Sequence, residues 1–172
     1  DSATMMNKGF EVIEAFWLFG FTPDRIKILV HPQSIIHSMI EMKDGAIKAQ
    51  MGVPDMKVPI QYALTYPRHL EAPWEQLDFL KCGDLTFEEP DFERFPCIKL
   101  AFDSLEKLGT SGAVLNLAND YSVYRFLNGE VKFMDIPRII ESSMKHHDWT
   151  EHPSLEHLKK LDNWVKNHVE SF

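Results

Sequence analysis

The sequence lacks any long run of apolar residues, and this absence limits the classes of protein that it can encode. No stretch approaches the ~20 apolar residues that a membrane-crossing helix needs, and the first residues do not follow the pattern of a signal peptide. We therefore expect no membrane partner. The chain begins with Asp1 rather than Met, so we also expect a processed product or a piece of a longer protein.

Cysteine and positive charge are also scarce. The two cysteines, Cys82 and Cys97, follow no metal-binding spacing, which favours two free thiols in a reducing compartment. Lys and Arg number 18 against 26 Asp and Glu, and the net charge of -8 argues against a nucleic-acid partner, which requires a basic patch. With 44% hydrophobic and 26% charged residues, the composition indicates a globular protein of one domain or two small ones.

The first part of the chain mixes helix and strand patterns. Residues 3–19 have the composition of a helix that is apolar on two sides, and residues 25–31 are rich in Ile, Leu and Val, as in a buried strand. A second strand over 34–42 and a third within 43–52 flank Asp44-Gly45, which predicts a hairpin. Residues 55–67 then predict a helix, with Pro59 near its start and Pro67 at its end.

The sequence pattern changes after residue 66. Four prolines interrupt residues 67–96, which predicts an extended arm. Only helical patterns follow, at 91–108, 112–128, 135–147 and 154–171, and short polar breaks between them favour an antiparallel bundle. The predicted fold class is therefore α+β: a small α/β piece with a short sheet (1–66), a linker arm (67–91) and a C-terminal helical bundle (92–172).

The first predicted helix carries a polar stripe between its two apolar sides. Asn7, Lys8 and Glu11 are three and four residues apart and are therefore neighbours on the helix surface, with Glu14 one turn further on. We place Ser2 at the N-cap, where free N–H groups suit an anion such as phosphate. Glu11 could bind a hard divalent cation. The alternative is a capped helix whose Lys8–Glu11 pair simply faces solvent.

Three blocks carry a family resemblance. The stretches "DSATMMNKGFEVIEAFWLFG", "HPQSIIHSMIEMKDGAIKAQMG" and "PDMKVPIQYALTYP", in this order and spacing, resemble the C-terminal portion of the 1-deoxy-D-xylulose 5-phosphate reductoisomerases. "FPCIKLAF" and "VLNLAND" fit more loosely, the latter departing from the usual "LNAANE". The family's N-terminal nucleotide-binding domain, its first two carboxylate metal ligands and a substrate-covering loop have no counterpart in these residues.

The resemblance implies roles for the stripe. Ser2, Asn7 and Lys8 would bind the phosphate and hydroxyls of a sugar-phosphate substrate, and Glu11 would contact the substrate and be one of three carboxylate ligands to Mg²⁺ or Mn²⁺. Lys8 and Glu11 would both be catalytic residues. It also implies a rearrangement of 1-deoxy-D-xylulose 5-phosphate followed by reduction with NADPH, giving 2-C-methyl-D-erythritol 4-phosphate for non-mevalonate isoprenoid synthesis. A homodimer formed through the sheet is implied too, in the bacterial cytoplasm or a plastid.

Two further residues are candidates by the same resemblance. His37 would be a catalytic or substrate-side residue. The alternative is a structural histidine whose hydrogen bonds are satisfied within a sheet. Met56 would lie near the nicotinamide of the cofactor, and the alternative is a methionine that fills the core.

Two competing interpretations remain open. The first is a zinc site formed by His146, His147, His152 and His157, which the adjacent first pair and the absence of an accompanying cysteine disfavour. The second is a truncated, non-catalytic fragment that acts only as a dimerisation or binding module. With one of three metal carboxylates and no nucleotide site, we expect these residues by themselves to be inactive.

Overall fold

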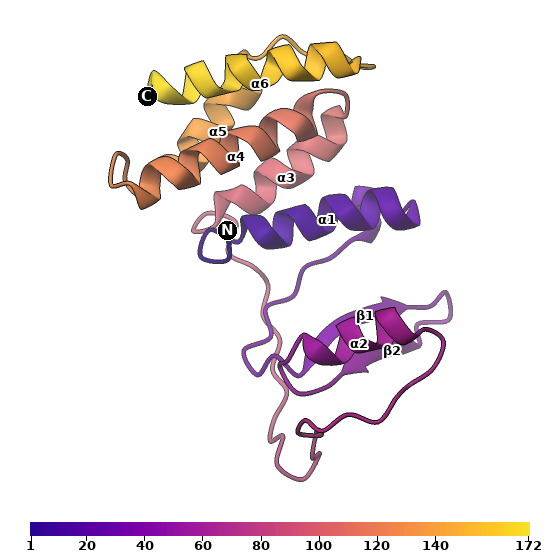
Figure 1. Ribbon diagram of the computed structural model, residues 1–172. Helices are drawn as coiled ribbons and strands as arrows, with labels where there is room; N and C mark the ends of the chain where they lie inside the picture. Colours follow the sequence, from indigo (N-terminus) through magenta and orange to yellow (C-terminus); the bar gives the residue numbers. More distant parts are fainter. The chain divides into compact units, whose positions relative to one another are not determined.

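The computed structural model describes all of residues 1–172, which form six α-helices, one 3₁₀ helix and a two-stranded sheet (Figure 1). The chain divides into two compact units, which are described separately. The first contains Asp1–Ile28 and Asp91–Phe172, and the second contains Leu29–Pro90. None of the helices combines the length and the apolar composition that crossing a membrane requires.

The first unit contains the four predicted helices of the C-terminal half, close to their expected bounds. They are α3 (Pro96–Lys107), α4 (Ser111–Leu127), α5 (Asp135–His146) and α6 (Leu155–Glu170). Pro96 occupies the first turn of α3, where a missing N–H costs nothing, so this helix begins later than its predicted start at residue 91. Ser154 caps α6 by accepting a hydrogen bond from the N–H of His157.

The core of the first unit lies between α3, α4, α5 and α6, and α4 packs against each of the other three (Figure 1). Ile136, Ile139 and Ile140 of α5 are almost fully buried, which confirms the helical periodicity predicted for this segment. The Cys97 thiol of α3 is also fully buried, and desolvation raises its pKa to about 11, so this thiol is held neutral.

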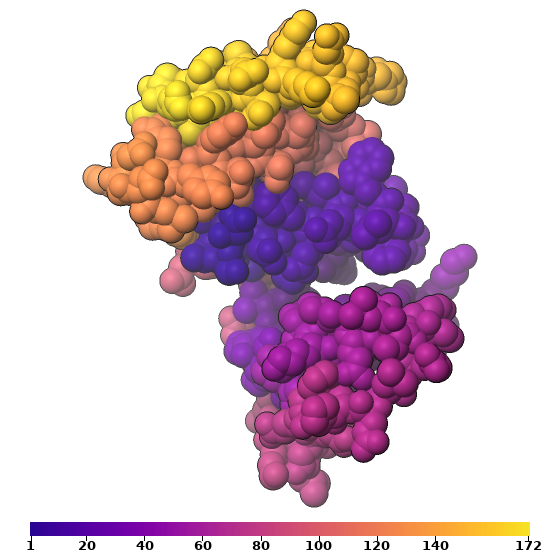
Figure 2. All heavy atoms as spheres, in the orientation of Figure 1, coloured from indigo at the N-terminus to yellow at the C-terminus, as the bar shows by residue number.

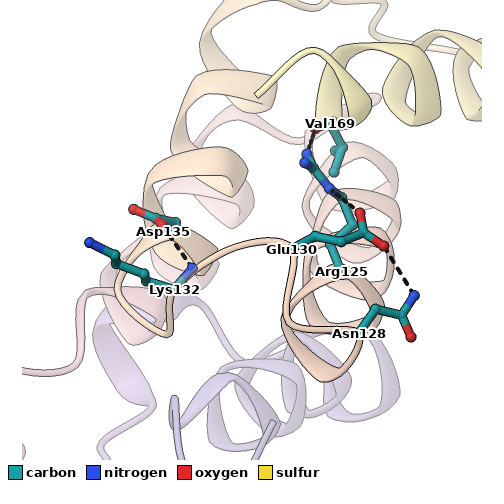
Figure 3. Close-up of polar contacts among 6 residues, drawn as sticks. All are labelled: Arg125, Asn128, Glu130, Lys132, Asp135 and Val169. Carbon is teal, nitrogen blue, oxygen red and sulfur yellow. Dashed lines mark hydrogen bonds and ion pairs between the residues drawn. The ribbon is translucent and has the colours of Figure 1, made fainter.

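The connection between α4 and α5 is fixed by a small polar network (Figure 3). The Arg125 guanidinium donates to the carbonyl of Val169 in the last turn of α6 and forms an ion pair of 3.1 Å with Glu130. Asp135, the first residue of α5, accepts a hydrogen bond of 2.9 Å from the N–H of Lys132 in the preceding turn. Arg125 thus ties the end of α4 to the end of α6.

The second unit contains the predicted hairpin. Strands β1 (Ile36–Glu41) and β2 (Ile47–Met51) pair antiparallel, and the turn contains Gly45 at φ 82°. Asp44 Oδ1 accepts a hydrogen bond from the N–H of Ala46. Helix α2 (Lys57–Thr65) follows, inside the range predicted for it.

The strand predicted over residues 25–31 is wrong. Pro23–Arg25 form the 3₁₀ helix η1, and from there only Val30 makes a strand-like contact, an isolated bridge to Glu88. An apolar extended segment becomes a strand only if a neighbouring strand pairs with its N–H and C=O groups, and this chain supplies one paired residue.

Helix α1 (Met6–Phe19) packs on α3 and belongs to the helical unit, whereas the sequence places residues 1–66 together with the hairpin. No helix or strand is formed between Thr65 and Pro96, where the arm was predicted. The assignment of 1–66, 67–91 and 92–172 to separate domains remains a prediction.

Candidate active site

Helix α1 begins one turn later than the sequence suggested. Residues 2–5 form a turn, Met5 lies at the N-cap with φ 57°, and the N–H of Met5 donates to the Ser2 carbonyl at 3.1 Å. The hydroxyl near the helix start is that of Thr4, which accepts a hydrogen bond from the N–H of Met6. The prediction that Ser2 caps the helix is therefore wrong, because the turn separates Ser2 from the first helical residue.

The predicted polar stripe is present, and its three members contact each other. The Asn7 amide donates to Oε1 of Glu11 at 2.9 Å, and Nζ of Lys8 lies 2.6 Å from Oε2 of Glu11. The Lys8 and Glu11 side chains are 41% and 47% exposed, so the pair remains accessible to a ligand. One helical turn thus presents an ammonium, an amide and a carboxylate together.

Both predicted apolar sides of α1 have a buried member, but the C-terminal end of the helix is exposed. Met6, Gly9 and Val12 are buried against α3, while Trp17 and Phe19 are 70% and 68% exposed. Figure 2 shows α1, in indigo, at the surface of its unit. Each predicted apolar side is therefore buried toward the start of α1 and exposed at its end, where Trp17 and Phe19 remain accessible.

A groove runs along the flank of α1 beside the stripe. Its volume is about 500 Å³, and it is lined by Asn7, Glu11 and Glu14 from α1 and by Leu108, Gly109 and Gly112 from the α3–α4 turn and the start of α4. Its lining also includes apolar side chains, among them Phe10, Ile13 and Leu105. Asn7 and Glu11 therefore lie at the edge of a groove that residues of α3 and α4 line on its other side.

The α3–α4 turn that forms this wall is held by the α5–α6 connection. Thr110 is fully buried, and its Oγ1 accepts a hydrogen bond of 3.0 Å from the N–H of Thr150 and lies 3.1 Å from Nε2 of His147. Trp149 donates from Nε1 to the carbonyl of Leu108. Burial lowers the pKa of His147, which favours the neutral ring in this contact.

His37 and Met56 belong to the second unit. Ile36 pairs with Met51 and Ser38 with Gln50, so His37 is the extra residue of a β-bulge and its side chain is exposed. Met56 is 66% exposed at the N-cap of α2 and does not fill a core in this chain. Their catalytic and cofactor-binding roles remain predictions.

Glu11 has the chemistry of a ligand for a divalent cation. A carboxylate offers about four lone-pair sites, and Asn7 and Lys8 use two of them. Carboxylate oxygen is also the donor that Mg²⁺ and Mn²⁺ prefer. Glu11 can therefore supply one ligand of a metal site. The site is only partial in this chain, because no three His, Cys, Asp or Glu side chains converge on one point.

The histidines of the C-terminal half have other contacts. His147 faces Thr110 in the interior, whereas His146 contacts Ser142 at the surface and His152 is largely exposed. They do not form a common site.

Sequence reasoning missed two structural features of this region. The close packing of Gly9 against Ala101 had a usable signal, since a glycine inside a helical pattern suggests close approach of another backbone. The bonds of Thr110 had none, because they join residues that are about 40 positions apart in sequence.

Comparisons with known proteins identify the family of the chain. Residues 51–168 match the family model of the DXP reductoisomerase C-terminal domain. The chain is 54% identical over 170 residues to the 1-deoxy-D-xylulose 5-phosphate reductoisomerase of Acetivibrio thermocellus, covering 99% of this chain and 45% of that protein. It is 50% identical over 166 residues to that of Heliobacterium modesticaldum, covering 96% and 42%.

Solved structures give the same result. The reductoisomerase of Zymomonas mobilis in complex with NADPH superposes with a TM-score of 0.92 at 46% identity, over 99% of this chain and 45% of that one. A DOX-P reductoisomerase in complex with NADPH, fosmidomycin and magnesium gives a TM-score of 0.89 at 37% identity, over 99% and 44%. The chain thus spans a little under half the length of the relatives it matches, and it belongs to the DXP reductoisomerase family as a C-terminal portion.

Proposed function

We propose that this chain is the C-terminal part of an NADPH-dependent reductoisomerase that converts 1-deoxy-D-xylulose 5-phosphate to 2-C-methyl-D-erythritol 4-phosphate for isoprenoid synthesis. The observation that carries the proposal is the Asn7–Lys8–Glu11 cluster on one turn of α1. Relatives about 50% identical over nearly the whole chain bear the name of this activity.

In the proposed site each side chain has a separate task. Lys8 and Asn7, with Ser2 from the preceding turn, bind the substrate's phosphate and hydroxyl groups by charge-assisted and neutral hydrogen bonds. Glu11 contributes one carboxylate to Mg²⁺ or Mn²⁺, and Asn7 keeps that carboxylate oriented. When bound, the cation would polarise the carbonyl and hydroxyl oxygens of the substrate.

We propose roles for two residues of the second unit, His37 and Met56. A β-bulge re-aims a side chain, and His37 lies at such a bulge, which supports its use on the substrate side. The exposed Met56 offers an apolar surface for the nicotinamide of NADPH. The remaining metal carboxylates and the nucleotide site would come from the intact protein, so we expect turnover only there.

Replacing Lys8 tests the phosphate role. In the intact protein, Lys8→Ala should raise KM for the sugar phosphate roughly tenfold or more, because a hydrogen bond from a charged group contributes about 1.5–3 kcal/mol. Initial rates of NADPH oxidation over a substrate series measure this. Lys145→Ala is the matched control, since Lys145 forms an exposed helical pair with Glu141 at the same 2.6 Å. An unchanged KM for Lys8→Ala would remove Lys8 from the site.

We also propose that the intact protein is a homodimer formed through the hairpin. Ile40 and Ile47 on β1 and β2 are 58% and 61% exposed, and an isolated two-stranded sheet leaves both outer edges unpaired. The bacterial cytoplasm is the proposed compartment, with the plastid as the alternative, and the matched relatives named above come from bacteria.

The dimer has a direct test in the mass of the intact protein in solution. We expect light scattering after size exclusion to give twice the chain mass, and Ile40→Lys to shift the protein toward monomer because it places a charge in the interface. Leu127→Lys is the control, since Leu127 is 70% exposed at the end of α4, in the other unit. A native protein that stays monomeric at every concentration would refute the dimer.

A further inference from the structure

The contact between α1 and α3 is unusually close at one point. A Cβ atom on Gly9 would lie 2.8 Å from the Cβ of Ala101, a distance that real Cβ atoms essentially never show. Ala101 is fully buried, and its methyl carbon is attached directly to the α3 backbone, so it has no rotamer that relieves a clash. Figure 1 shows the two helices side by side. Gly9 therefore sets how near the helices come.

Met6 and Val12 complete the same buried face of α1. They lie three residues to either side of Gly9, and both are nearly inaccessible to solvent, at 0% and 2%. These two side chains hold α1 along its axis, while the Gly9–Ala101 contact holds its distance from α3. These contacts together fix the position of α1 on the helical unit and its distance from α3.

The polar stripe lies on the opposite side of the same helix. Asn7 precedes Gly9 by two residues and Glu11 follows it by two, and two residues turn an α-helix by about 200°. Because a helical turn moves as a rigid body, a displacement of α1 at Gly9 moves the Glu11 carboxylate by a similar amount. The position of the Glu11 carboxylate therefore depends directly on the distance between α1 and α3.

We propose that Gly9 and Ala101 are positioning residues for catalysis, and that the C-terminal helical unit serves as the seat that places the metal-binding and phosphate-binding stripe. This inference rests on the proposed function. Neither residue contacts the stripe side chains, and both act through the position of α1.

The expected size of the effect follows from atomic dimensions. Two carbon atoms reach their optimal separation at about 3.5–4.0 Å, so a methyl group on Gly9 would push the helices apart by roughly 1 Å. A misplacement of about 1 Å far from the chemistry can lower a rate on the order of a hundredfold. Alanine is also a better helix former than glycine, so the helix itself should persist.

The test uses Gly9→Ala, Ala101→Gly and the double variant in the intact protein. We expect Gly9→Ala to lower kcat/KM at least tenfold and to raise the Mg²⁺ concentration needed for half-maximal rate. The double variant moves the methyl group from one helix to the other, so it should recover kcat/KM to within about threefold of wild type. A wild-type rate for Gly9→Ala, or a loss that Ala101→Gly does not repair, would overturn the proposal.

Two additional measurements keep the result interpretable. If Gly9→Ala does not fold, Ala101→Ser adds a single oxygen to the same contact and should lower kcat/KM at least threefold, and a wild-type rate for it would overturn the proposal. Glu11→Gln is measured in parallel. Full activity of Glu11→Gln would count against the proposed function, whereas an inactive Glu11→Gln beside a normal Gly9→Ala would reject only the positioning role.

Discussion

Glu11→Gln, introduced into the intact protein, should lower kcat/KM roughly a hundredfold or more and raise the Mg²⁺ requirement. The amide has the same shape as the carboxylate, but it carries no charge with which to hold a divalent cation where substrate charge develops. Rates of NADPH oxidation, measured over matched series of substrate and Mg²⁺ concentrations, give both quantities. The fold should survive, because Asn7 can still donate to the carbonyl oxygen of the new amide and the exposed ion pair with Lys8 contributes only about 0–1 kcal/mol.

A second glutamate serves as the control for this substitution. Glu141 on α5 also pairs with a lysine, Lys145, at 2.6 Å and is similarly exposed. Glu141→Gln removes the same charge and the same kind of contact at a place remote from the stripe along the chain, and it should leave kcat/KM near wild type. Equal activity of the two variants would show that Glu11 holds no metal needed for turnover.

Gly109→Ala should destabilise the helical unit by about 2–4 kcal/mol, the largest stability effect that we expect from a single methyl group. Gly109 has φ +55°, a conformation that side chains with a Cβ adopt only at a cost. The added carbon would clash with the Thr150 carbonyl oxygen and lie 3.0 Å from Nε1 of Trp149. The substitution therefore forces apart the α3–α4 turn and the α5–α6 connection.

Urea unfolding followed by circular dichroism measures this difference, and a neighbouring glycine provides the control. Gly112 has no atom within 4 Å of the position that a Cβ would take. Gly112→Ala should therefore be neutral or slightly stabilising, because alanine reduces the entropy of the unfolded chain. If the two variants unfold at the same urea concentration, the turn is not clamped as described.

Local sequence patterns predicted the elements whose determinants lie within the element. The Asp44-Gly45 turn specified the hairpin, and the spacing of Ile136, Ile139 and Ile140 specified α5 and its buried face. The Asn7–Lys8–Glu11 cluster was equally accessible, because residues three and four apart on a helix must be neighbours.

The incorrect predictions depend on partners that a local pattern does not contain. Residues 25–31 have strand composition, but strand formation needs a neighbour, and only Val30 finds one, at Glu88. The Ser2 cap failed because the chain makes a turn before α1, and a hydroxyl can cap only the residues that follow it directly. Gly9 within a helical pattern indicates that another backbone comes close, but it does not identify Ala101, which lies more than ninety positions away.

The most direct test of the central claim is substrate-dependent oxidation of NADPH by the intact protein, assayed with Mg²⁺ and again with a metal chelator. The account predicts that 1-deoxy-D-xylulose 5-phosphate triggers oxidation in the presence of Mg²⁺ and that the chelator abolishes it. NADPH that stays reduced in the presence of both substrate and metal would contradict the assignment of the α1 stripe to a reductoisomerase active site.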